Sequence, residues 1–536
     1  MGYIYLILET SIFSLGVINM ERPILNHFYN YDEICDYLFA AKKEYPDVMQ
    51  LDELARTDED RVIWGVTLAK GNPEDKPALY VQGGVHAQEG MGITCSLNFL
   101  WTVLQQQELL DKLTFYILPC VNPDGSDLCV RTGISVRSKL EIIPGLRNSV
   151  IPADLDGDGK ILSMRWKDPM GPFVCVPGCG DFMVRRTPED EGPFYDMCTE
   201  GEVENYDGGV LEQYYRDLDF NRQYALDWKD NYNGGDFPGN HIEPATVMRF
   251  LVAHPNIFAV MDIHCGTRAL IYSDPANTAD AALMQKLADL CNEVTGIEPI
   301  THGNYARRSG AKATHLYGHI DSFCYEGLGV PSVTVELGNG YNSMGMTAQE
   351  VFDGNLYGRE LMTKIVAMHA AKGRVIAEPW KPYKHPQLGD VEIGGQIHSN
   401  AYFMDPDDML DLIPKVADYF LEVIKLVPVL ALGGVTCDAM GGGVYRIRAH
   451  AYNRSRVNTK MMQGSAGYHA NNCAVEIKVS GVKEILSRTA VASVASLAPM
   501  QMYPMEWFVR AEPGDTITIE ATHPKAIKAT ESVVAP

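Results

Sequence analysis

The strongest constraint on the fold is an alternation of apolar, β-branched segments with longer amphipathic ones. The predicted strands lie at 61–69, 78–85, 112–121, 257–265 and 330–337, and the predicted helices at 31–48, 92–110, 279–294 and 352–373. Strands that are apolar throughout are typical of a sheet covered on both faces. The alternation therefore predicts an α/β domain with a mixed central sheet flanked by helices on both faces.

Changes in composition divide the chain into further parts. We expect a catalytic domain over residues 25–425, interrupted at about 138–218 by a stretch rich in Pro, Gly, Asp and Glu that resembles a large loop insertion. Short alternating strands separated by Gly, Asn and Pro predict a small all-β sandwich domain over 430–536. Residues 1–24 are interpreted as a leader or a mis-assigned start, with Met20 as the alternative first residue.

The charge of the chain restricts its partners. A formal net charge of −24 over 536 residues disfavours nucleic acid, which rewards clustered Lys and Arg. The apolar run at the start is short for a membrane span and lacks a basic region before it. We therefore expect no nucleic acid and no membrane span, and we place the protein in the cytoplasm, with secretion or a periplasmic location as the alternative.

Polar, reactive residues follow four of the predicted strands. His86 and Glu89 come after 78–85, an Asn-Pro-Asp-Gly sequence at 122–125 follows 112–121, and His264 and Glu336 end the strands at 257–265 and 330–337. In open α/β sheets, sites form at the carboxyl ends of strands. These segments are therefore expected to converge.

The four residues have the chemistry of a metal site. His86 and Glu89, three residues apart on a turn, can bind one face of a zinc ion, with His264 as a third ligand and water as the fourth. A single His at a strand end is more often a hydrogen-bonded core residue, and a carboxylate such as Glu336 is costly there without a partner or a task. The combination favours a zinc site.

The same motifs carry a resemblance to a known family. The sequences HAQE (86–89), NPDG (122–125), DFNRQY (219–224), IHCG (263–266) and TVEL (334–337) occur in the order seen in the zinc carboxypeptidase family, of the carboxypeptidase A/B-like type. The resemblance covers about residues 25–375. It implies one zinc ion per chain, held by His86, Glu89 and His264, with Glu336 as general base.

Further residues are assigned through this resemblance. Arg137 matches the arginine that polarises the scissile carbonyl, and Asn221 and Arg222 match the pair that binds the terminal carboxylate of the substrate. A planar guanidinium suits a carboxylate because it can bind both oxygens. Without the motifs, a surface salt bridge would be the ordinary interpretation of either arginine.

The resemblance is incomplete around the substrate. Gln88 stands where digestive members of the family have an arginine, and Tyr317 is our choice for the mobile tyrosine of the cleft. Either Ile320 or Asp321 is expected to face the side-chain pocket. Ile320 would favour apolar C-terminal residues and Asp321 basic ones.

The insertion contains a second possible metal site. Asp154, Asp156 and Asp158 are spaced like the start of a calcium loop, with Gly159 at the turn, but position twelve is Arg165 and not a bidentate Glu. An Asp-rich turn without a metal is the alternative.

Three functions follow from these features. The first is a zinc metallocarboxypeptidase acting on a peptide or small amide with a free C-terminal carboxylate. The second is a related zinc amidohydrolase or deacylase acting on N-acyl amino acids or on cell-wall or side-chain-linked peptides. The third is a catalytically inactive binding module with the same fold, which the presence of all three ligands and Glu336 disfavours.

Overall fold

The computed structural model describes residues 20–143, 145–176, 179–211, 215–229, 233–308, 316–347, 349–350, 359–397, 405–463 and 473–536. Residues 1–19, which contain most of the predicted leader, lie outside the described residues, so the leader and the compartment stay predictions. Within the described residues, no helix is both long and apolar enough to cross a membrane.

An eight-stranded mixed sheet forms the centre of the α/β domain. Its strands, in their order across the sheet, are β1 (Met49–Arg56), β2 (Val62–Leu68), β4 (Thr114–Leu118), β3 (Ala78–Gly83), β13 (Ile257–His264), β16 (Ser332–Leu337), β14 (Arg268–Tyr272) and β15 (Glu298–Thr301). The four central strands, β4, β3, β13 and β16, run parallel to one another. Their carboxyl ends therefore meet at one edge of the sheet.

Helices cover both faces of this sheet, as predicted. One face packs against α1 (Tyr31–Glu44), α2 (Gly90–Leu104), α5 (Thr278–Thr295) and α11 (Met409–Val423). The other face packs against α4 (Ile242–Ala253), α7 (Ile320–Ser322) and η4 (Phe323–Leu328). Successive side chains of β3 point to opposite faces of the sheet. Leu79 and Val81 pack in the core beneath α2 and α11, and Tyr80 packs in the core beneath α4.

The insertion is not the loop that we expected. It forms the short strands β5 (Lys139–Ile142), β6 (Ser149–Pro152), β7 (Ser163–Lys167), β8 (Phe173–Val176), β9 (Cys179–Arg185), β10 (Tyr195–Thr199), β11 (Gly201–Glu204) and β12 (Tyr215–Leu218). Four of them join β17 (Ala377–His385) and β18 (Gly389–Gln396) in a six-stranded sheet of order β17-β18-β7-β10-β8-β9. Strands of four to seven residues with many polar positions show little periodicity, which explains the wrong prediction.

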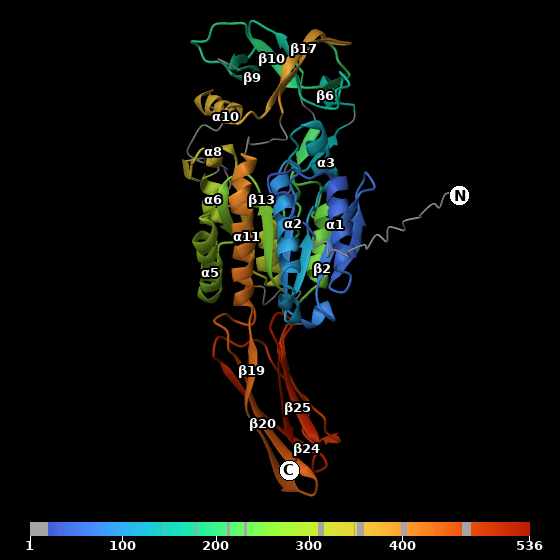
Figure 1. The fold of residues 1–536 in the computed structure, drawn as a ribbon, viewed down its shortest axis with the longest axis vertical. Helices are drawn as coiled ribbons and strands as arrows, with labels where there is room; N and C mark the ends of the chain where they lie inside the picture. The colour runs from blue at the N-terminus through green and yellow to red at the C-terminus, as the bar shows by residue number, and fades with distance from the viewer. Residues whose placement is uncertain are drawn as a thin grey trace, which may run out of the picture.

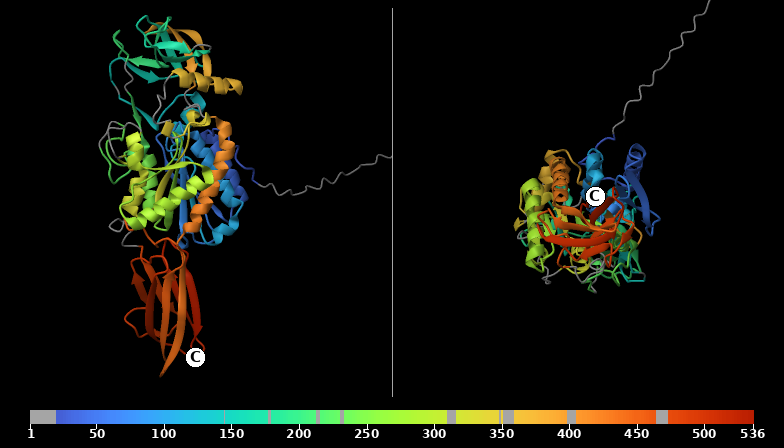
Figure 2. Two further views of the ribbon diagram at one scale, coloured as in Figure 1. Left: turned by 90° about the vertical axis from the view of Figure 1, so that its left-hand side faces the viewer. Right: turned by 90° about the horizontal axis from the view of Figure 1, so that it is seen from below.

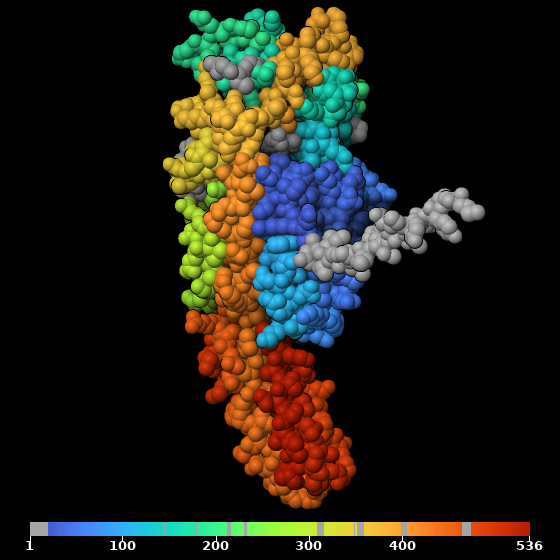
Figure 3. Space-filling model, in the orientation of Figure 1, coloured from blue at the N-terminus to red at the C-terminus, as the bar shows by residue number. Residues whose placement is uncertain are grey.

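The second sheet combines segments that are remote in sequence. The Pro-rich segment after the last core helix supplies β17, whose prolines are tolerated because β17 is an edge strand. In Figures 1 and 3 the strands of the insertion and of β17 and β18 gather at one end of the elongated molecule. β5 pairs with β12, so the insertion leaves and re-enters the α/β domain at adjacent positions.

A β-sandwich forms the opposite end of the molecule (Figure 2). One sheet contains β19 (Leu430–Gly441), β20 (Val444–Asn453), β24 (Met502–Arg510) and β22 (Glu484–Ile485), and the other β23 (Val491–Val494), β21 (Val475–Ser480), β25 (Thr516–Thr522) and β26 (Ala529–Val534). Alternate residues of the two sheets, among them Ile447, Ile477, Trp507 and Ile519, form one buried core. The predicted all-β sandwich is confirmed.

The remaining elements are short or connect the sheets. They are η1 (Pro73–Asp75), η2 (Gln107–Asp111), α3 (Pro123–Thr132), η3 (Phe220–Arg222), α6 (His302–Arg308), α8 (Gly340–Ser343), α10 (Arg359–Ala371), η6 (Pro406–Asp408) and η7 (Ile424–Leu426).

A buried glutamate in the first turn of α4 makes stability depend on pH. Both carboxylate oxygens of Glu243 lack a hydrogen-bond partner among the described residues, and burial raises its pKa to about 7. Because an unfolded Glu ionises near its usual pKa, the folded protein loses stability as the pH rises from about 4.5 to about 7. We expect Glu243→Gln to stabilise the protein at pH 8 by about 3 kcal/mol. Urea unfolding of wild type and variant at pH 4.5 and pH 8 measures the difference in their free energies of unfolding. An equal difference at the two pH values would contradict the prediction.

Candidate metal centre

The loop from β3 to α2 is shaped by close backbone packing. A Cβ atom on Gly83 would lie 2.4 Å from the carbonyl oxygen of Gly92, and a Cβ on Gly92 would lie 2.9 Å from that of Ile263. Only glycine allows the first turn of α2 to approach β3 and β13 so closely. This approach brings His86 and Glu89, on the loop, beside His264 at the end of β13.

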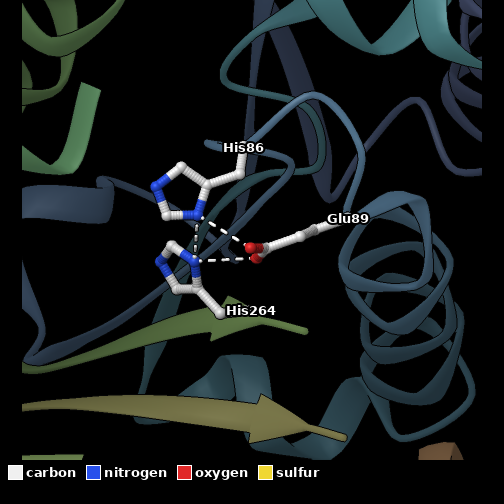
Figure 4. Close-up of side chains that lie close together, drawn as sticks. All are labelled: His86, Glu89 and His264. Carbon is white, nitrogen blue, oxygen red and sulfur yellow. Dashed lines mark hydrogen bonds and ion pairs between the residues drawn. The ribbon is translucent and has the colours of Figure 1, made fainter. Parts of the chain in front are cut away.

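Three side chains converge at this point, as the resemblance implied (Figure 4). Nδ1 of His86 lies 3.0 Å from one carboxylate oxygen of Glu89, and Nδ1 of His264 lies 3.0 Å from the other. The two Nδ1 atoms are 2.9 Å apart. All three residues are buried.

The outer nitrogens of both histidines face carboxylates. Nε2 of His86 lies 3.0 Å from Oδ1 of Asp219, and Nε2 of His264 lies 2.7 Å from Oδ2 of Asp262. A carboxylate only accepts hydrogen bonds, so both Nε2 atoms carry the proton in the neutral rings. Both Nδ1 lone pairs then point at each other and at Glu89. Three electron-rich atoms at this spacing fit a cation, and the two-His, one-carboxylate set fits zinc.

The charges of the cluster agree with this assignment. Burial alone would raise the pKa of Glu89, but His86 and His264 hold it well below its usual value. Burial alone would lower the pKa of His264, but the carboxylates of Asp262 and Glu89 raise it well above its usual value. The pocket of carboxylates therefore favours positive charge, and a bound cation would take the place of a proton.

The Asn-Pro-Asp-Gly motif positions Arg137. The Asn122 side chain caps α3 by accepting a hydrogen bond from the amide of Gly125, and its Nδ2 donates to the carbonyl of Ser138 at 2.7 Å. The backbone of Arg137 in turn accepts a hydrogen bond from the amide of Ala87 at 2.8 Å. The motif thus ties Arg137 to the loop that carries the metal ligands.

Arg137 and Arg222 meet at Asp219. The Arg137 guanidinium lies 2.7 Å from Glu89 and 3.2 Å from Asp219, and Arg222 lies 3.9 Å from Asp219. Both arginines are partly exposed, whereas Asp219 is buried. Burial would raise the pKa of Asp219, but Arg137, Arg222 and His86 hold it well below its usual value. Asp219, which our sequence analysis did not assign, links both arginines to His86.

Glu336 lies beside the three ligands. It is the register partner of His264 across β13 and β16, and its Oε2 is buried without a hydrogen-bond partner among the described residues. Burial and the neighbouring Glu89 raise its pKa to about 8, a shift that a bound cation would oppose. A buried carboxylate oxygen without a partner is costly, which marks it as a candidate for chemistry.

Gly266 leaves the space that the Glu336 carboxylate occupies. A Cβ atom at Gly266 would lie 3.2 Å from Oε2 of Glu336. We expect Gly266→Val to displace this carboxylate and to lower kcat by about tenfold or more with the metal content unchanged. Steady-state kinetics with metal analysis measures this. Full activity in the zinc-loaded variant would show that the Glu336 carboxylate tolerates displacement.

Asn221 does not present a free amide in this structure. Its Oδ1 accepts a hydrogen bond from the amide of Ile320 at 3.0 Å, and its Nδ2 lies 3.0 Å from Nε2 of His319. The residue is buried. Its Nδ2 also lies 3.4 Å from Nε2 of His264. The side chain of Asn221 is therefore engaged within the protein in this structure, and its role in binding a substrate carboxylate stays a prediction.

Ile320 and Asp321 do not line an open pocket either. Ile320 is fully buried in the apolar core between the sheet and α4. The Asp321 carboxylate, also fully buried, accepts hydrogen bonds from Ser332 and Thr334 at 2.5 and 2.9 Å and contacts His302 and His319 at 3.1 and 3.4 Å. The expectation that one of them faces a side-chain pocket is wrong in this structure.

Two tyrosines are candidates for the cleft. Tyr305, in α6, is partly exposed; burial of its hydroxyl is the main reason that its pKa is raised, Glu336 raises it further and Arg137 lowers it. Tyr317, our choice from the sequence, packs its ring against Lys229 with Nζ 5.0 Å from the ring centre. The role of Tyr317 in the cleft stays a prediction.

The Asp-rich loop is stabilised by its own backbone. Oxygens of Asp154 accept hydrogen bonds from the amides of Gly157 and Gly159, and Lys381 lies 3.0 Å from Asp158. Asp154, Asp156 and Asp158 lie close enough to share an ion, but these contacts already account for an Asp-rich turn. Nothing in the structure adds support for calcium.

Comparison with known proteins finds similarity to one family over part of the chain. Residues 34–141 match the family model described as zinc carboxypeptidase. The match includes His86 and Glu89 and ends before His264 and Glu336. Residues 429–534, which include the sandwich, match a domain of unknown function.

The curated relatives are similar to a part of the chain. Carboxypeptidase B of Astacus astacus is 30% identical over 102 residues, which cover 18% of this chain and 33% of that protein. Carboxypeptidase B of Helicoverpa zea is 35% identical over 104 residues, which cover 18% and 24%. A relative from Saccharomyces cerevisiae named inactive metallocarboxypeptidase is 26% identical over 110 residues, which cover 19% and 26%. The chain thus spans about a quarter to a third of the length of these relatives.

The chain is also similar to solved structures at low sequence identity. Bovine thrombin-activatable fibrinolysis inhibitor, in complex with tick carboxypeptidase inhibitor, is 14% identical with a TM-score of 0.40, covering 75% of this chain and 99% of that one. The metallo-carboxypeptidase of Burkholderia cenocepacia is 12% identical with a TM-score of 0.34, covering 74% and 70%.

Proposed function

We propose that the protein is a zinc metallocarboxypeptidase that hydrolyses the amide bond next to a free C-terminal carboxylate. One observation carries the proposal. The ligand atoms of His86, Glu89 and His264 converge within 3.0 Å of one another, and the partnerless carboxylate of Glu336 lies beside them. This is the arrangement that metal-assisted hydrolysis requires.

Each residue then has a role in the proposed reaction. Zinc, when bound, would lower the pKa of a water molecule towards about 7 and polarise the scissile carbonyl. Oε2 of Glu336 would accept the proton of the attacking water and later pass it to the leaving amine. Arg137 would stabilise the negative charge that develops on the carbonyl oxygen.

Recognition of the substrate carboxylate would fall mainly to Arg222. Its guanidinium is partly exposed, and its pairing with Asp219 is long, at 3.9 Å. The insertion starts and ends next to Arg137 and Asp219, because β5 and β12 pair there in a two-stranded sheet of their own. We propose that the insertion limits the size of the substrate that reaches the centre.

A second candidate function is favoured by one observation. One of the groups expected to bind a terminal carboxylate, the amide of Asn221, is engaged by Ile320 and His319 in this structure. A zinc amidohydrolase acting on N-acyl amino acids or on side-chain-linked peptides would depend less on that group.

The test combines metal analysis with substrate profiling. The purified protein should contain about one zinc per chain and should trim single residues from the C-termini of a peptide library, as seen by mass spectrometry. Faster turnover of N-acyl amino acids than of peptides would select the second candidate. Zinc binding without turnover of any amide would identify a binding module, and a protein that takes up no zinc would refute the proposal.

A further inference from the structure

We propose that Asp262 is a positioning residue that sets the tautomer and direction of His264, and that Gln82 holds Asp262 in place. This inference rests on the proposed metal centre. Neither residue was a candidate in the sequence, and neither would touch the metal or the substrate.

The sheet register places these residues in one row beneath the centre. Gln82 of β3, Asp262 of β13 and Thr334 of β16 are neighbours across the three parallel strands. Two residues further along, on the same face, His264 is the neighbour of Glu336. Gln82 and Asp262 are completely buried in strands that are otherwise mostly apolar. A buried amide and a buried carboxylate are costly there unless they have defined partners.

The hydrogen bonds of this row run in one direction. The Tyr80 hydroxyl lies 2.7 Å from Oε1 of Gln82, Nε2 of Gln82 donates to Oδ1 of Asp262 at 2.8 Å, and Oδ2 of Asp262 lies 2.7 Å from Nε2 of His264. Because Gln82 takes one oxygen of Asp262, the other remains for His264. The proton of neutral His264 is thereby held on Nε2, and its Nδ1 lone pair faces His86 and Glu89.

A comparison with Asp321 separates this role from ordinary burial. Asp321 is as deeply buried as Asp262, but its carboxylate contacts two hydroxyls and two histidines, His302 and His319, that lie outside the proposed His86, Glu89 and His264 centre. Among the described residues, the Asp262 carboxylate has hydrogen bonds to the side chains of Gln82 and His264 alone. Its carboxylate has no lysine or arginine partner there, so its charge acts through His264.

Replacing Asp262 with the isosteric Asn should reverse the proton on His264. With Nε2 of Gln82 donating to the Asn oxygen, the Asn amide group faces Nε2 of His264 as a donor. The imidazole must then accept at Nε2 and carry its proton on Nδ1, where it blocks the metal. Alternatively, the side-chain amides of Gln82 and of the new Asn could both turn over. The Tyr80 hydroxyl would then face the amide nitrogen of Gln82 and lose its acceptor.

The experiment measures zinc affinity by competition with a chelator of known affinity. We compare the full-length protein with Asp262→Asn, Gln82→Leu and the control Asp321→Asn, and confirm folding by circular dichroism. Asp262→Asn is expected to weaken zinc binding about 10- to 100-fold, as losses of such outer partners do. Gln82→Leu should weaken it by a smaller factor, and Asp321→Asn should stay within about threefold of wild type. The absorption spectrum of the cobalt-substituted proteins reports the change in geometry.

The outcomes separate this inference from the proposed function. Wild-type protein that binds no zinc would refute the metal centre and the role of Asp262 with it. Tight zinc binding by wild type and equally tight binding by folded Asp262→Asn would refute the role of Asp262 alone. So would equal losses in Asp262→Asn and Asp321→Asn, which would indicate general damage to the sheet. If Asp262→Asn does not fold, unchanged affinity in Gln82→Leu overturns the inference and weaker binding supports it.

Discussion

Glu336→Gln is expected to lower kcat about 100- to 10,000-fold while zinc remains bound. The amide is nearly the size of the carboxylate but cannot accept the proton of the attacking water. The change leaves His86, Glu89 and His264 in place, so metal affinity and KM should change little. The metal-free variant should be no less stable than wild type, because burial and Glu89 already raise the pKa of Glu336 to about 8.

Glu243→Gln is a matched control for this substitution. Glu243 is also a buried glutamate with partnerless carboxylate oxygens, but it lies in α4 and outside the metal centre. We expect Glu243→Gln to retain wild-type kcat and Glu336→Gln to lose it, in steady-state assays of zinc-loaded proteins. If Glu336→Gln kept more than about a tenth of wild-type kcat, the base would have to be another residue.

Removal of the metal is expected to reduce hydrolysis more than about a thousandfold, because water activation and carbonyl polarisation are lost together. Dialysis against a chelator followed by addition of zinc should restore activity in wild type. In His264→Ala the restoration should fail, since two ligands remain and the charge of Asp262 is left without its partner. Zinc should also raise the unfolding temperature of wild type and not that of the variant.

His385→Ala serves as the control for loss of a buried histidine. His385 lies in β17 of the second sheet, where its Nε2 lies 3.1 Å from the carbonyl oxygen of Gly201. This variant should regain activity with zinc as wild type does. Full activity of wild type after thorough removal of the metal would contradict a metal-dependent mechanism.

The convergence of the proposed metal ligands and Glu336 was predictable, because each residue stands at or just beyond the carboxyl end of a strand. The local sequence pattern predicts these strands. Parallel neighbours bring such ends together, so residues 86, 264 and 336 meet without any knowledge of side-chain packing. The same local signal failed in the insertion, where the short strand β7 pairs with β18 and Arg165 faces Glu392, 227 residues later. The pairing partner lies too far along the chain for local periodicity to report it.

Assignments around the substrate depend more on tertiary contacts. Asn221 was matched to a carboxylate-binding role by its motif, but His319 and Ile320 engage its amide in this structure. Neither Tyr305 nor Tyr317 can be placed relative to the centre without the path of α6 and the segment after it. Asp262 could have been predicted as a functional candidate from the sequence, because it is a carboxylate in an apolar strand two residues before His264.

The sequence by itself determined the α/β class and the sandwich and predicted that His86, Glu89, His264 and Glu336 meet, because strand periodicity and strand ends are local properties of the chain. The tertiary structure alone decided which atoms face one another: the protons held by Asp219 and Asp262, the occupied amide of Asn221 and the sheet built by the insertion. Such partners depend on the register between strands and on side-chain packing over long separations, which local sequence patterns do not encode.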